Sequence, residues 1–534
     1  MNTFPPRAET LARLEAHEWD LVVIGGGISG AGVAQQAARA GWSVLLVEQR
    51  DYAWGTSSRS SKLVHGGLRY LKEGDLKTTL HSVRERERLL REAPGLVEPQ
   101  SFLFADCPGR KPGRWLMQAG LAVYDLMAGQ RGHFHANLAA TQMIAPGLAP
   151  PGLRGALVFQ DAKTDDARLV LRVLQEARRL GATTLNYVAA SGLRLEHGRT
   201  TGLDLQDTLD GKTYGVRARC VVNATGAWAD RLRAGAGSKP LLRPLRGSHL
   251  LVPAWRLPVA HAFSFMHAGD KRPVFVFPWE GATVIGTTDL DHPAPLAEEA
   301  RISPDEVDYL LAACGQQFPA AAINAADVLS TWAGVRPVVT DGSEGRKPSD
   351  EKREHALWVE PGCVTLAGGK LTTFRLLALE VLQACAPMVG RTLDDQGAAT
   401  FAVVPQQPMP QLSPAQQKRL IGRYGRALPR VLALLDELGV EQVSGTDTLW
   451  AELAWAAEQE LVLHLDDLLL RRTRLGLLLA CGAAAELPRI RVLCQARLGW
   501  DDARWQEEEQ AYLQLWQRCY SLPAEDGSRG RTAS

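Results

Sequence analysis

The hydrophobic positions near the start of the chain follow a strand, helix, strand pattern. Residues 19–24 (WDLVVI) form an apolar, β-branched run that ends abruptly in a glycine-rich turn, GGGISG, at residues 25–30. Small, helix-compatible residues continue to residue 40, and residues 43–47 form a second apolar run. Runs of this length and composition predict two buried parallel strands joined by one helix.

The glycine turn and the acidic residue after the second run have the spacing of a dinucleotide-binding unit. Gly25 permits a tight turn, Gly27 lets the backbone approach a pyrophosphate, and Gly30 allows close packing of the helix on the strand. The N-terminus of the helix offers free N–H groups to the phosphates. Glu48, 23 positions after Gly25, can accept hydrogen bonds from ribose hydroxyl groups. The motif does not by itself distinguish NAD from FAD.

Two later segments repeat the change from an apolar strand to a small-residue turn. Residues 219–222 lead into NATGAW at 223–228, and residues 363–367 lead into GGKLTTFR at 368–375. Strand-to-turn segments this far apart in the sequence indicate one nucleotide-binding unit assembled from distant parts of the chain. A self-contained NAD-binding module would not need the two later segments. Each segment alone is also compatible with an ordinary structural turn.

The rest of the chain separates into a strand-rich middle and a helical end. Short strands are predicted at 248–254, 262–267, 273–277 and 283–288, as in an antiparallel sheet that could form the wall of a substrate site. A helix is predicted at 169–180 and a hairpin at 204–214. Residues 405–414 are proline-rich and predict a linker. Ser413 and Pro414 then begin a helical pattern that continues to about residue 520.

Composition and charge restrict the class of protein. The 534 residues are 46% hydrophobic and 22% charged, which is typical of a globular chain of several domains. The 60 basic and 59 acidic residues nearly cancel, which argues against nucleic acid as the main partner. The eight scattered cysteines form no C-x-x-C pair, so we expect reduced thiols in a cytoplasmic protein and no metal site. No apolar run reaches 18 residues, so no membrane-spanning helix is expected.

A series of motifs resembles the FAD-dependent, quinone-reducing (aerobic) glycerol-3-phosphate dehydrogenases. The most specific motif is TSSRSSKLVHGGLRYL at residues 56–71. The others, in chain order, are GGGISGAG at 25–32, DDARLVL at 165–171, VVNATGAWA at 221–229, GSH at 247–249, PWEGATVIGTTD at 278–289, GVRP at 334–337, GGKLTTFR at 368–375 and DDLLLRRTRLGLL at 466–478. The resemblance extends, with gaps, from about residue 18 to about residue 515.

The resemblance implies a mixed α/β fold. A discontinuous, glutathione-reductase-like FAD-binding Rossmann domain would be combined with an antiparallel-sheet substrate domain and a C-terminal all-helical domain. The expected boundaries within residues 19–404 are about 19–85, 155–245 and 325–400 for FAD binding, and about 86–154 and 246–324 for the substrate part. Residues 1–18 would be an N-terminal extension, 405–414 a linker, 415–520 the helical domain and 521–534 a disordered tail.

The resemblance also implies an activity and a location. The reaction would be the oxidation of sn-glycerol 3-phosphate to dihydroxyacetone phosphate, with hydride transfer from C2 to N5 of non-covalent FAD and electrons passed to membrane quinone. The protein would be cytoplasmic and peripheral on the inner face of the cytoplasmic membrane, and a homodimer is compatible with it. Two alternatives stay open: an oxidase that uses O2, and a non-catalytic flavoprotein sensor or scaffold.

The substrate is a dianion, which requires fixed cations, and arginine and lysine bind phosphate well. By resemblance, the substrate-binding candidates are Arg69, Tyr70, Thr288, Arg336, Arg353 and Lys370. Arg353 lies in a charged loop, RKPSDEKREH, whose composition differs from that of the family. Lys370 is expected at the start of a helix beside the flavin.

Oxidation of an alcohol also needs a base for the hydroxyl proton, and histidine can act near neutral pH. His249 is favoured, and His65 and Arg336 complete the catalytic candidates. A hydrogen-bonded structural imidazole is the alternative for His249. Asp289 follows Thr288 and could equally be a turn residue.

The same motifs assign a set of residues to the cofactor, including a serine-rich segment whose hydroxyl and N–H groups would lie along the flavin. Ser29 stands where the family often has Asn. The cofactor-binding candidates are Gly25, Gly27, Ile28, Ser29, Gly30, Glu48, Gln49, Thr56, Ser57, Ser58, Ser61, Lys62, Leu63, His65, Gly66, Ala224, Thr225, Gly226, Gly334, Arg336, Gly369, Lys370, Leu371 and Thr372.

Residues 110–127 are a candidate contact with a membrane surface. Arg110, Lys111, Arg114, Trp115 and Tyr124 accompany an apolar stretch there. Basic and aromatic residues beside an apolar face suit a bilayer interface. A helix packed into the core is the alternative.

Overall fold

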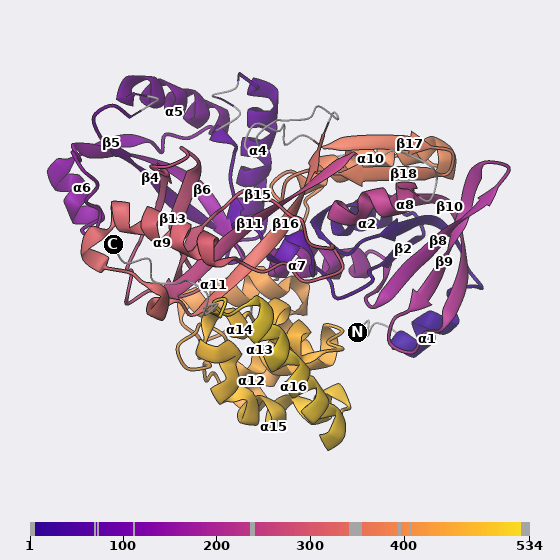
Figure 1. Ribbon diagram of the computed structural model, residues 1–534. Coiled ribbons are helices and arrows are strands. Elements are labelled where there is room, and N and C mark those ends of the chain that lie inside the picture. The colour runs from indigo at the N-terminus through magenta and orange to yellow at the C-terminus, as the bar shows by residue number, and fades with distance from the viewer. Residues whose placement is uncertain are drawn as a thin grey trace, which may run out of the picture.

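The computed structural model contains two large sheets side by side and a helical domain below them (Figure 1). It describes residues 6–68, 71, 74–110, 113–234, 241–340, 355–393, 397–405 and 407–524. The tail predicted at 521–534 lies outside the described residues from residue 525 onward.

The first sheet has eight strands and begins with the predicted nucleotide-binding unit. Its order is β17-β18-β10-β1-β2-β7, with β9 paired to β10 and β8 paired to β9. The strands are β1 (Glu18–Ile24), β2 (Val44–Val47), β7 (Thr183–Leu185), β8 (Val188–Glu196), β9 (Arg199–Asp207), β10 (Thr213–Asn223), β17 (Ala356–Glu360) and β18 (Cys363–Ala367). β1 is parallel to both β10 and β2, so the three predicted segments come together in one sheet. The predicted hairpin is also confirmed, as β9 and β10 pair antiparallel.

Three helices pack together with the central strands of this sheet in one hydrophobic core. They are α2 (Ile28–Arg39), α7 (Asp166–Arg179) and α10 (Phe374–Val389). The central strands are buried along almost their whole length, which explains why they are continuous apolar runs in the sequence.

The second sheet has ten strands, and among the described residues its strands pair antiparallel, except that β12 is parallel to β4. Its strands are β3 (Leu63–Val64), β4 (Val97–Asp106), β5 (Phe134–Asn137), β6 (Gly155–Thr164), β11 (Leu242–Pro253), β12 (Ala262–Met266), β13 (Pro273–Trp279), β14 (Ala282–Gly286), β15 (Leu290–Asp291) and β16 (Ser330–Val339). The four strands predicted between residues 248 and 289 are therefore confirmed as parts of β11, β12, β13 and β14.

Sheet membership does not follow the expected FAD-binding pieces at two strands. β6 and β16 fall in the pieces predicted at 155–245 and 325–400, yet both belong to the second sheet. β16 pairs with β11 from Leu242↔Val339 to Leu251↔Ser330, and β3 pairs with β6. The pattern of apolar residues predicts a strand, but the choice of neighbouring strand depends on contacts distant in sequence.

The remaining helices complete the two layers and the helical domain. Those outside the helical domain are α1 (Arg7–Ala12), α4 (Leu76–Glu92), α5 (Arg114–Ala128), α6 (Leu138–Ile144), α8 (Ala229–Ala234) and α9 (Pro304–Gln317). The helical domain contains α11 (Pro414–Tyr424), α12 (Leu428–Leu438), α13 (Trp450–Gln459), a π-helical turn (Asp467–Arg472), α14 (Leu475–Leu478), α15 (Leu487–Leu498) and α16 (Asp502–Cys519).

The helical domain begins as predicted but is less separate than the sequence suggested. Ser413 Oγ accepts from the Gln416 N–H, and the Gln416 side chain accepts from the Ser413 N–H, which confirms the predicted cap. Its core is continuous with that of the second sheet, because Trp279 and Trp332 share one hydrophobic cluster with Leu469. The domain therefore packs directly on the sheet.

Two further observations concern membrane-spanning helices, disulfide bonds and metal sites. Among the described residues, no helix is both long enough and apolar enough to cross a membrane. The cysteines are unpaired, and the described part of the chain holds no group of three or more His, Cys, Asp or Glu side chains arranged for a metal ion.

Candidate active site

The glycine turn after β1 forms a backbone cradle at the N-terminus of α2. Gly25 has φ 114°, in the left-handed region that favours glycine, and a Cβ on Gly30 would lie 1.9 Å from the Gly25 carbonyl oxygen. Ser57 closes one side of the cradle, since its Oγ accepts from the Ile28 N–H at 3.0 Å and lies 3.0 Å from a Cβ placed on Gly27. A turn without side chains at the positive end of a helix fits the pyrophosphate of a dinucleotide.

Glu48 lies at the end of β2, next to this cradle. Its carboxylate accepts from the Gly26 N–H at 2.7 Å and from the Arg50 N–H at 3.0 Å. Burial raises the pKa of Glu48. The backbone bonds hold the carboxylate in one orientation beside the turn, as the predicted contact with a ribose requires.

The two later segments meet the glycine turn in space. The Ala224 N–H donates to the Ile24 carbonyl at 2.9 Å, and a Cβ on Gly25 would lie 2.5 Å from the Ala224 carbonyl oxygen. Thr225 Oγ1 donates to Asn223 Oδ1 at 2.7 Å. Thr372 Oγ1 donates to the His65 carbonyl at 3.2 Å, which connects the third segment to the serine-rich motif. The residues present thus fit FAD, whose extended form contacts several segments.

The serine-rich segment connects the cradle to the second sheet. Thr56 Oγ1 donates to the Val335 carbonyl in β16, and Ser58 is buried. A Cβ on Gly334 would lie 2.6 Å from the Arg59 carbonyl oxygen, so β16 requires glycine there to approach the segment closely. These contacts place the nucleotide cradle and the strand that carries Arg336 on either side of the same segment.

The Lys62 side chain is bonded to partners within the protein. The side chain is 0% exposed, and Nζ donates to the Ser58 carbonyl at 3.1 Å and to Asp166 Oδ1 at 3.0 Å. Burial lowers the pKa of Lys62 to about 8, although Asp166 raises it. Leu63 is also buried, in the core of the second sheet. For these two candidates, only the backbone is available to a cofactor.

His249 lies in β11, between β14 and β16. It is 1% exposed, its ring stacks on Trp332 with centroids 4.9 Å apart, and its Nε2 lies 2.9 Å from Ser61 Oγ. Gly286 is needed opposite, because a Cβ there would lie 2.2 Å from His249 Cδ2. Burial, with the nearby Arg336 and Lys62 cations, lowers the pKa of His249 well below 6.5. The imidazole is therefore neutral at physiological pH, with the Ser61 hydroxyl against its Nε2.

Arg336 is held at the point where β11, β14 and β16 come together. Its NH1 lies 2.7 Å from Asp289 Oδ1, and its NH2 donates to Thr287 Oγ1 at 3.1 Å. Gly247 makes room for the guanidinium, because a Cβ there would lie 2.4 Å from Arg336 NH2. The side chain remains 22% exposed, so the guanidinium is fixed in place and accessible at the same time.

Two sequence interpretations change at this position. Thr288 is buried, with Oγ1 donating to Glu306 Oε1 at 2.6 Å and accepting from the Ser248 N–H, so its side chain is directed to the protein and not to the predicted substrate contact. Thr287 contacts Arg336 instead, and Asp289 is the ion-pair partner of that arginine. The alternation of side chains near a strand end decides which threonine faces the site, and a one-residue difference reverses it.

The other candidates are placed as follows. His65 is exposed, in contrast to His249. Lys370 is half-buried and precedes α10 by four residues rather than starting it, because the turn at 371–373 comes between them. The Gly66 N–H donates to Asp161 Oδ1 at 2.9 Å. Ser29, Gln49 and Leu371 are partly exposed beside these segments, whereas Gly226 has φ 60° in the turn after β10. Arg69, Tyr70 and Arg353 lie outside the described residues.

Comparison with known proteins identifies the family. The FAD dependent oxidoreductase family matches residues 20–375, and the C-terminal domain of alpha-glycerophosphate oxidase matches residues 365–505. The aerobic glycerol-3-phosphate dehydrogenase of Bacillus subtilis is 34% identical over 88% of this chain and 89% of its own length. The chain belongs to the aerobic glycerol-3-phosphate dehydrogenase family. The Staphylococcus aureus enzyme of that name is 31% identical over 89% of both chains.

The solved structures agree with this family. The glycerol-3-phosphate dehydrogenase from Bacillus halodurans, complexed with FAD, has a TM-score of 0.74 and 27% identity. The match covers 95% of this chain and 97% of that one. The predicted resemblance, the mixed α/β FAD-binding fold with its helical domain, and FAD as cofactor are confirmed. The chain is thus an FAD-dependent oxidoreductase of the aerobic glycerol-3-phosphate dehydrogenase family.

Proposed function

We propose that this protein oxidises sn-glycerol 3-phosphate to dihydroxyacetone phosphate, with FAD bound non-covalently. The observation that carries the proposal is the pair of Arg336 and His249 on the adjacent strands β16 and β11. The arginine offers a fixed cation to an anionic substrate, and the histidine offers a neutral base. The names of the relatives at 31–34% identity support the same substrate.

Each residue has a distinct task in this proposal. FAD, when bound, would supply the acceptor (N5) for the hydride that leaves C2 of the substrate. Arg336, held by Asp289 and Thr287, binds the phosphate of the substrate and fixes its position in the site. Ser61 Oγ lies 2.9 Å from His249 Nε2. In this proposal Nε2 of the neutral imidazole accepts from the Ser61 hydroxyl, and the Ser61 oxygen accepts the proton of the substrate hydroxyl, so that a proton passes to the imidazole. Arg69, Tyr70 and Lys370 are proposed as further substrate contacts.

An anaerobic titration tests this function directly. Adding sn-glycerol 3-phosphate to the FAD-loaded protein without oxygen is expected to bleach the visible flavin absorbance with one equivalent of substrate per flavin. The same titration with glycerol, which lacks the phosphate bound by Arg336, is the control. A protein that binds FAD but is not bleached by the phosphate ester would instead be a sensor or scaffold.

We propose that the electrons pass to a membrane quinone and that the protein is peripheral on the inner face of the cytoplasmic membrane. The support is the surface of α5, whose six exposed positions are all apolar: Trp115, Leu116, Ala119, Ala122, Val123 and Leu126. Trp115 is 75% exposed and Leu126 is 82% exposed. The opposite face packs into the molecule through Leu121 and Tyr124. An apolar helix face of this kind on the upper layer in Figure 1 suits a lipid interface.

The basic residues at and just before the start of α5 contribute less to the proposed membrane surface than the sequence suggested. Arg110 donates to the Ser264 carbonyl at 3.0 Å and to the Ala105 carbonyl, and burial lowers its pKa. Its guanidinium therefore fixes the loop and is not a free surface charge. Arg114 lies over the Trp115 ring at 5.0 Å, and Lys111 lies outside the described residues.

Replacing Leu116 and Leu126 together with aspartate is expected to reduce binding to liposomes at least about tenfold, because each of these exposed leucines would contribute about 2 kcal/mol when its side chain enters the lipid. Cosedimentation with anionic vesicles measures the effect. Val492→Asp is the matched control, since Val492 is 85% exposed on α15 in the helical domain. Equal binding by both variants would contradict the membrane role of α5.

Peroxide release equal to substrate turnover, with no gain from added quinone, would indicate the oxidase alternative.

A further inference from the structure

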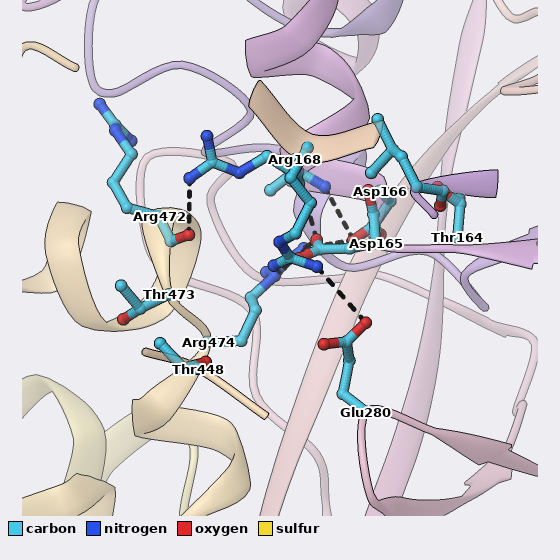
Figure 2. Close-up of polar contacts among 12 residues, drawn as sticks. Thr164, Asp165, Asp166, Arg168, Glu280, Thr448, Arg472, Thr473 and Arg474 are labelled. Atoms are coloured by element: carbon cyan, nitrogen blue, oxygen red, sulfur yellow. Dashed lines mark hydrogen bonds and ion pairs between the residues drawn. The ribbon is translucent and has the colours of Figure 1, made fainter. Parts of the chain in front are cut away.

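A buried cluster of charges joins the helical domain to the FAD-binding domain. Arg474, just before α14, has Nε 2.9 Å from Asp165 Oδ1 and contacts Asp166 Oδ1 through NH2. Arg423, in α11, has NH2 2.9 Å from Asp165 Oδ2. Figure 2 shows Arg474 pointing from the helical domain toward the two aspartates at the start of α7. These four side chains are at most 2% exposed, so solvent does not screen their charges.

Asp166 continues this contact into the serine-rich segment. Its Oδ2 accepts from the Ser60 N–H at 3.0 Å and from Ser60 Oγ at 2.7 Å, and its Oδ1 accepts from Lys62 Nζ. Arg474 also donates directly to the Ser58 carbonyl at 3.3 Å. Lys62 has φ 53°, a conformation that a lysine rarely adopts without outside restraint. The segment is therefore held in a strained shape by groups behind it.

The same segment orients the candidate base. Ser61 lies between the two residues held by Asp166, and its Oγ is 2.9 Å from His249 Nε2. Trp332, on which His249 stacks, donates from Nε1 to the Ser60 carbonyl at 3.3 Å. The Lys62 ammonium lies 4.7 Å from the centroid of the Trp332 ring. Two groups that contact the imidazole, the Ser61 hydroxyl and the Trp332 ring, are thus part of residues 60–62 or in contact with them.

We propose that Arg474 is a positioning residue, through which the helical domain fixes the segment that carries Ser61 against His249. Arg474 acts on Asp166, Asp166 acts on Ser60 and Lys62, and these set the direction of the Ser61 hydroxyl. The inference rests on the proposed function only for the role of the Ser61–His249 pair in proton transfer. The contact between the domains and the segment is independent of it.

The first test measures the segment itself. Hydrogen–deuterium exchange of the FAD-loaded protein is expected to be faster at residues 56–66 in Arg474→Met than in the unmodified chain, because Asp166, the acceptor of the Ser60 N–H, is no longer held by Arg474. Arg168→Met is the matched control. Arg168 is also 2% exposed and joins α7 to the helical domain through Glu460 at 2.6 and 2.9 Å. Its NH2 also donates to the Arg472 carbonyl at 2.8 Å, so these guanidinium bonds are directed away from residues 58–62. Equal exchange at residues 56–66 in both variants would overturn the proposal.

The second test measures the chemistry by anaerobic stopped flow. The limiting rate of flavin reduction in Arg474→Met is expected to fall at least about tenfold, with less than about a threefold change in the substrate concentration at half-saturation. Arg474→Lys, which keeps a cation beside Asp166, should recover part of the rate. Arg168→Met should keep the full rate. A loss of rate shared equally by Arg168→Met and Arg474→Met would overturn the positioning role.

A milder variant covers the case in which Arg474→Met does not fold. Ser60→Ala removes two hydrogen bonds of the segment, to Asp166 and from the Lys62 N–H, without burying an unpaired charge. It is expected to show the same faster exchange and slower reduction, with an unchanged FAD content. Unchanged exchange and rate would overturn the proposal. If substrate fails to reduce the unmodified protein, the proposed function is wrong, and the exchange experiment still decides the inference about the segment.

Discussion

Replacing Arg336 with alanine is expected to lower kcat/KM for sn-glycerol 3-phosphate by about 100- to 1,000-fold. A guanidinium that makes two charge-assisted hydrogen bonds to a phosphate contributes about 3–4 kcal/mol. Asp289 and Thr287 hold the Arg336 guanidinium in place before the substrate arrives, so the arginine binds the phosphate without reorganisation. Steady-state kinetics with an artificial acceptor would measure the loss, and the FAD content should stay constant.

Two controls make the Arg336 result specific. Arg336→Lys keeps the charge but not the forked geometry, and it should recover only part of the activity. Arg243→Ala removes an arginine from β11 that pairs with Asp291 near the surface, and its kinetics should not change. If Arg336→Ala retained normal kinetics, the phosphate would bind elsewhere, with Arg69 and Lys370 as the next candidates.

Replacing Asp51 with alanine is expected to lower the free energy of unfolding by about 3–5 kcal/mol, because two buried arginines lose their shared partner. Arg472 makes a forked contact with Asp51 at 2.6 and 2.7 Å, and Arg471 Nε contacts the same carboxylate. All three side chains are at most 1% exposed, and they join the FAD-binding domain to the helical domain. The midpoint of urea unfolding of the FAD-loaded protein measures the change.

The same ion pair predicts a pH dependence. Burial alone would raise the pKa of Asp51, but Arg472 and Arg471 lower it from 3.8 to about 2. Because the folded pKa lies below that of the unfolded chain, the stabilisation is fully present above about pH 4 and declines as the pH falls toward 2. The stabilisation by the Asp51 carboxylate itself should therefore be constant from neutral pH to about pH 5. The neighbouring Asp467, whose pKa burial and Asp51 raise to about 6, adds a separate change near pH 6 to the difference between the unmodified chain and Asp51→Ala. Asp210→Ala, an exposed ion pair with Lys212, should leave the midpoint unchanged.

The sequence was most informative where a local backbone requirement limits the residue type. The turn at Gly25 and Gly30 needs residues without Cβ, and this requirement is visible in the spacing alone. The cap at Ser413 and the buried strand at 363–367 are likewise local features, and the structure confirms both. Even the cooperation of three distant segments could be predicted, because each ends a strand with a similar small-residue turn.

The sequence was least informative about which side chains pair with one another. Arg471, Arg472 and Arg474 form an obvious basic group within an apolar helical stretch, which is a signal of buried ion pairs. Nothing in the sequence connects them to Asp51 or to Asp165 and Asp166, which precede them by more than 300 residues. The choice between Thr287 and Thr288, and the burial of His249 behind Ser61, depended in the same way on the packing of neighbouring strands.

By itself, the sequence determined the nucleotide-binding unit, the strand-rich middle, the helical end and, by resemblance, the family. These features depend on short-range patterns, since hydrophobic period, glycine position and capping residues act within a few residues of one another. Only the tertiary structure decided which sheet β6 and β16 join, which side chains surround Arg336, and how the helical domain reaches residues 60–62. Those properties arise from contacts between distant segments, whose energies depend on burial and geometry that no local pattern specifies.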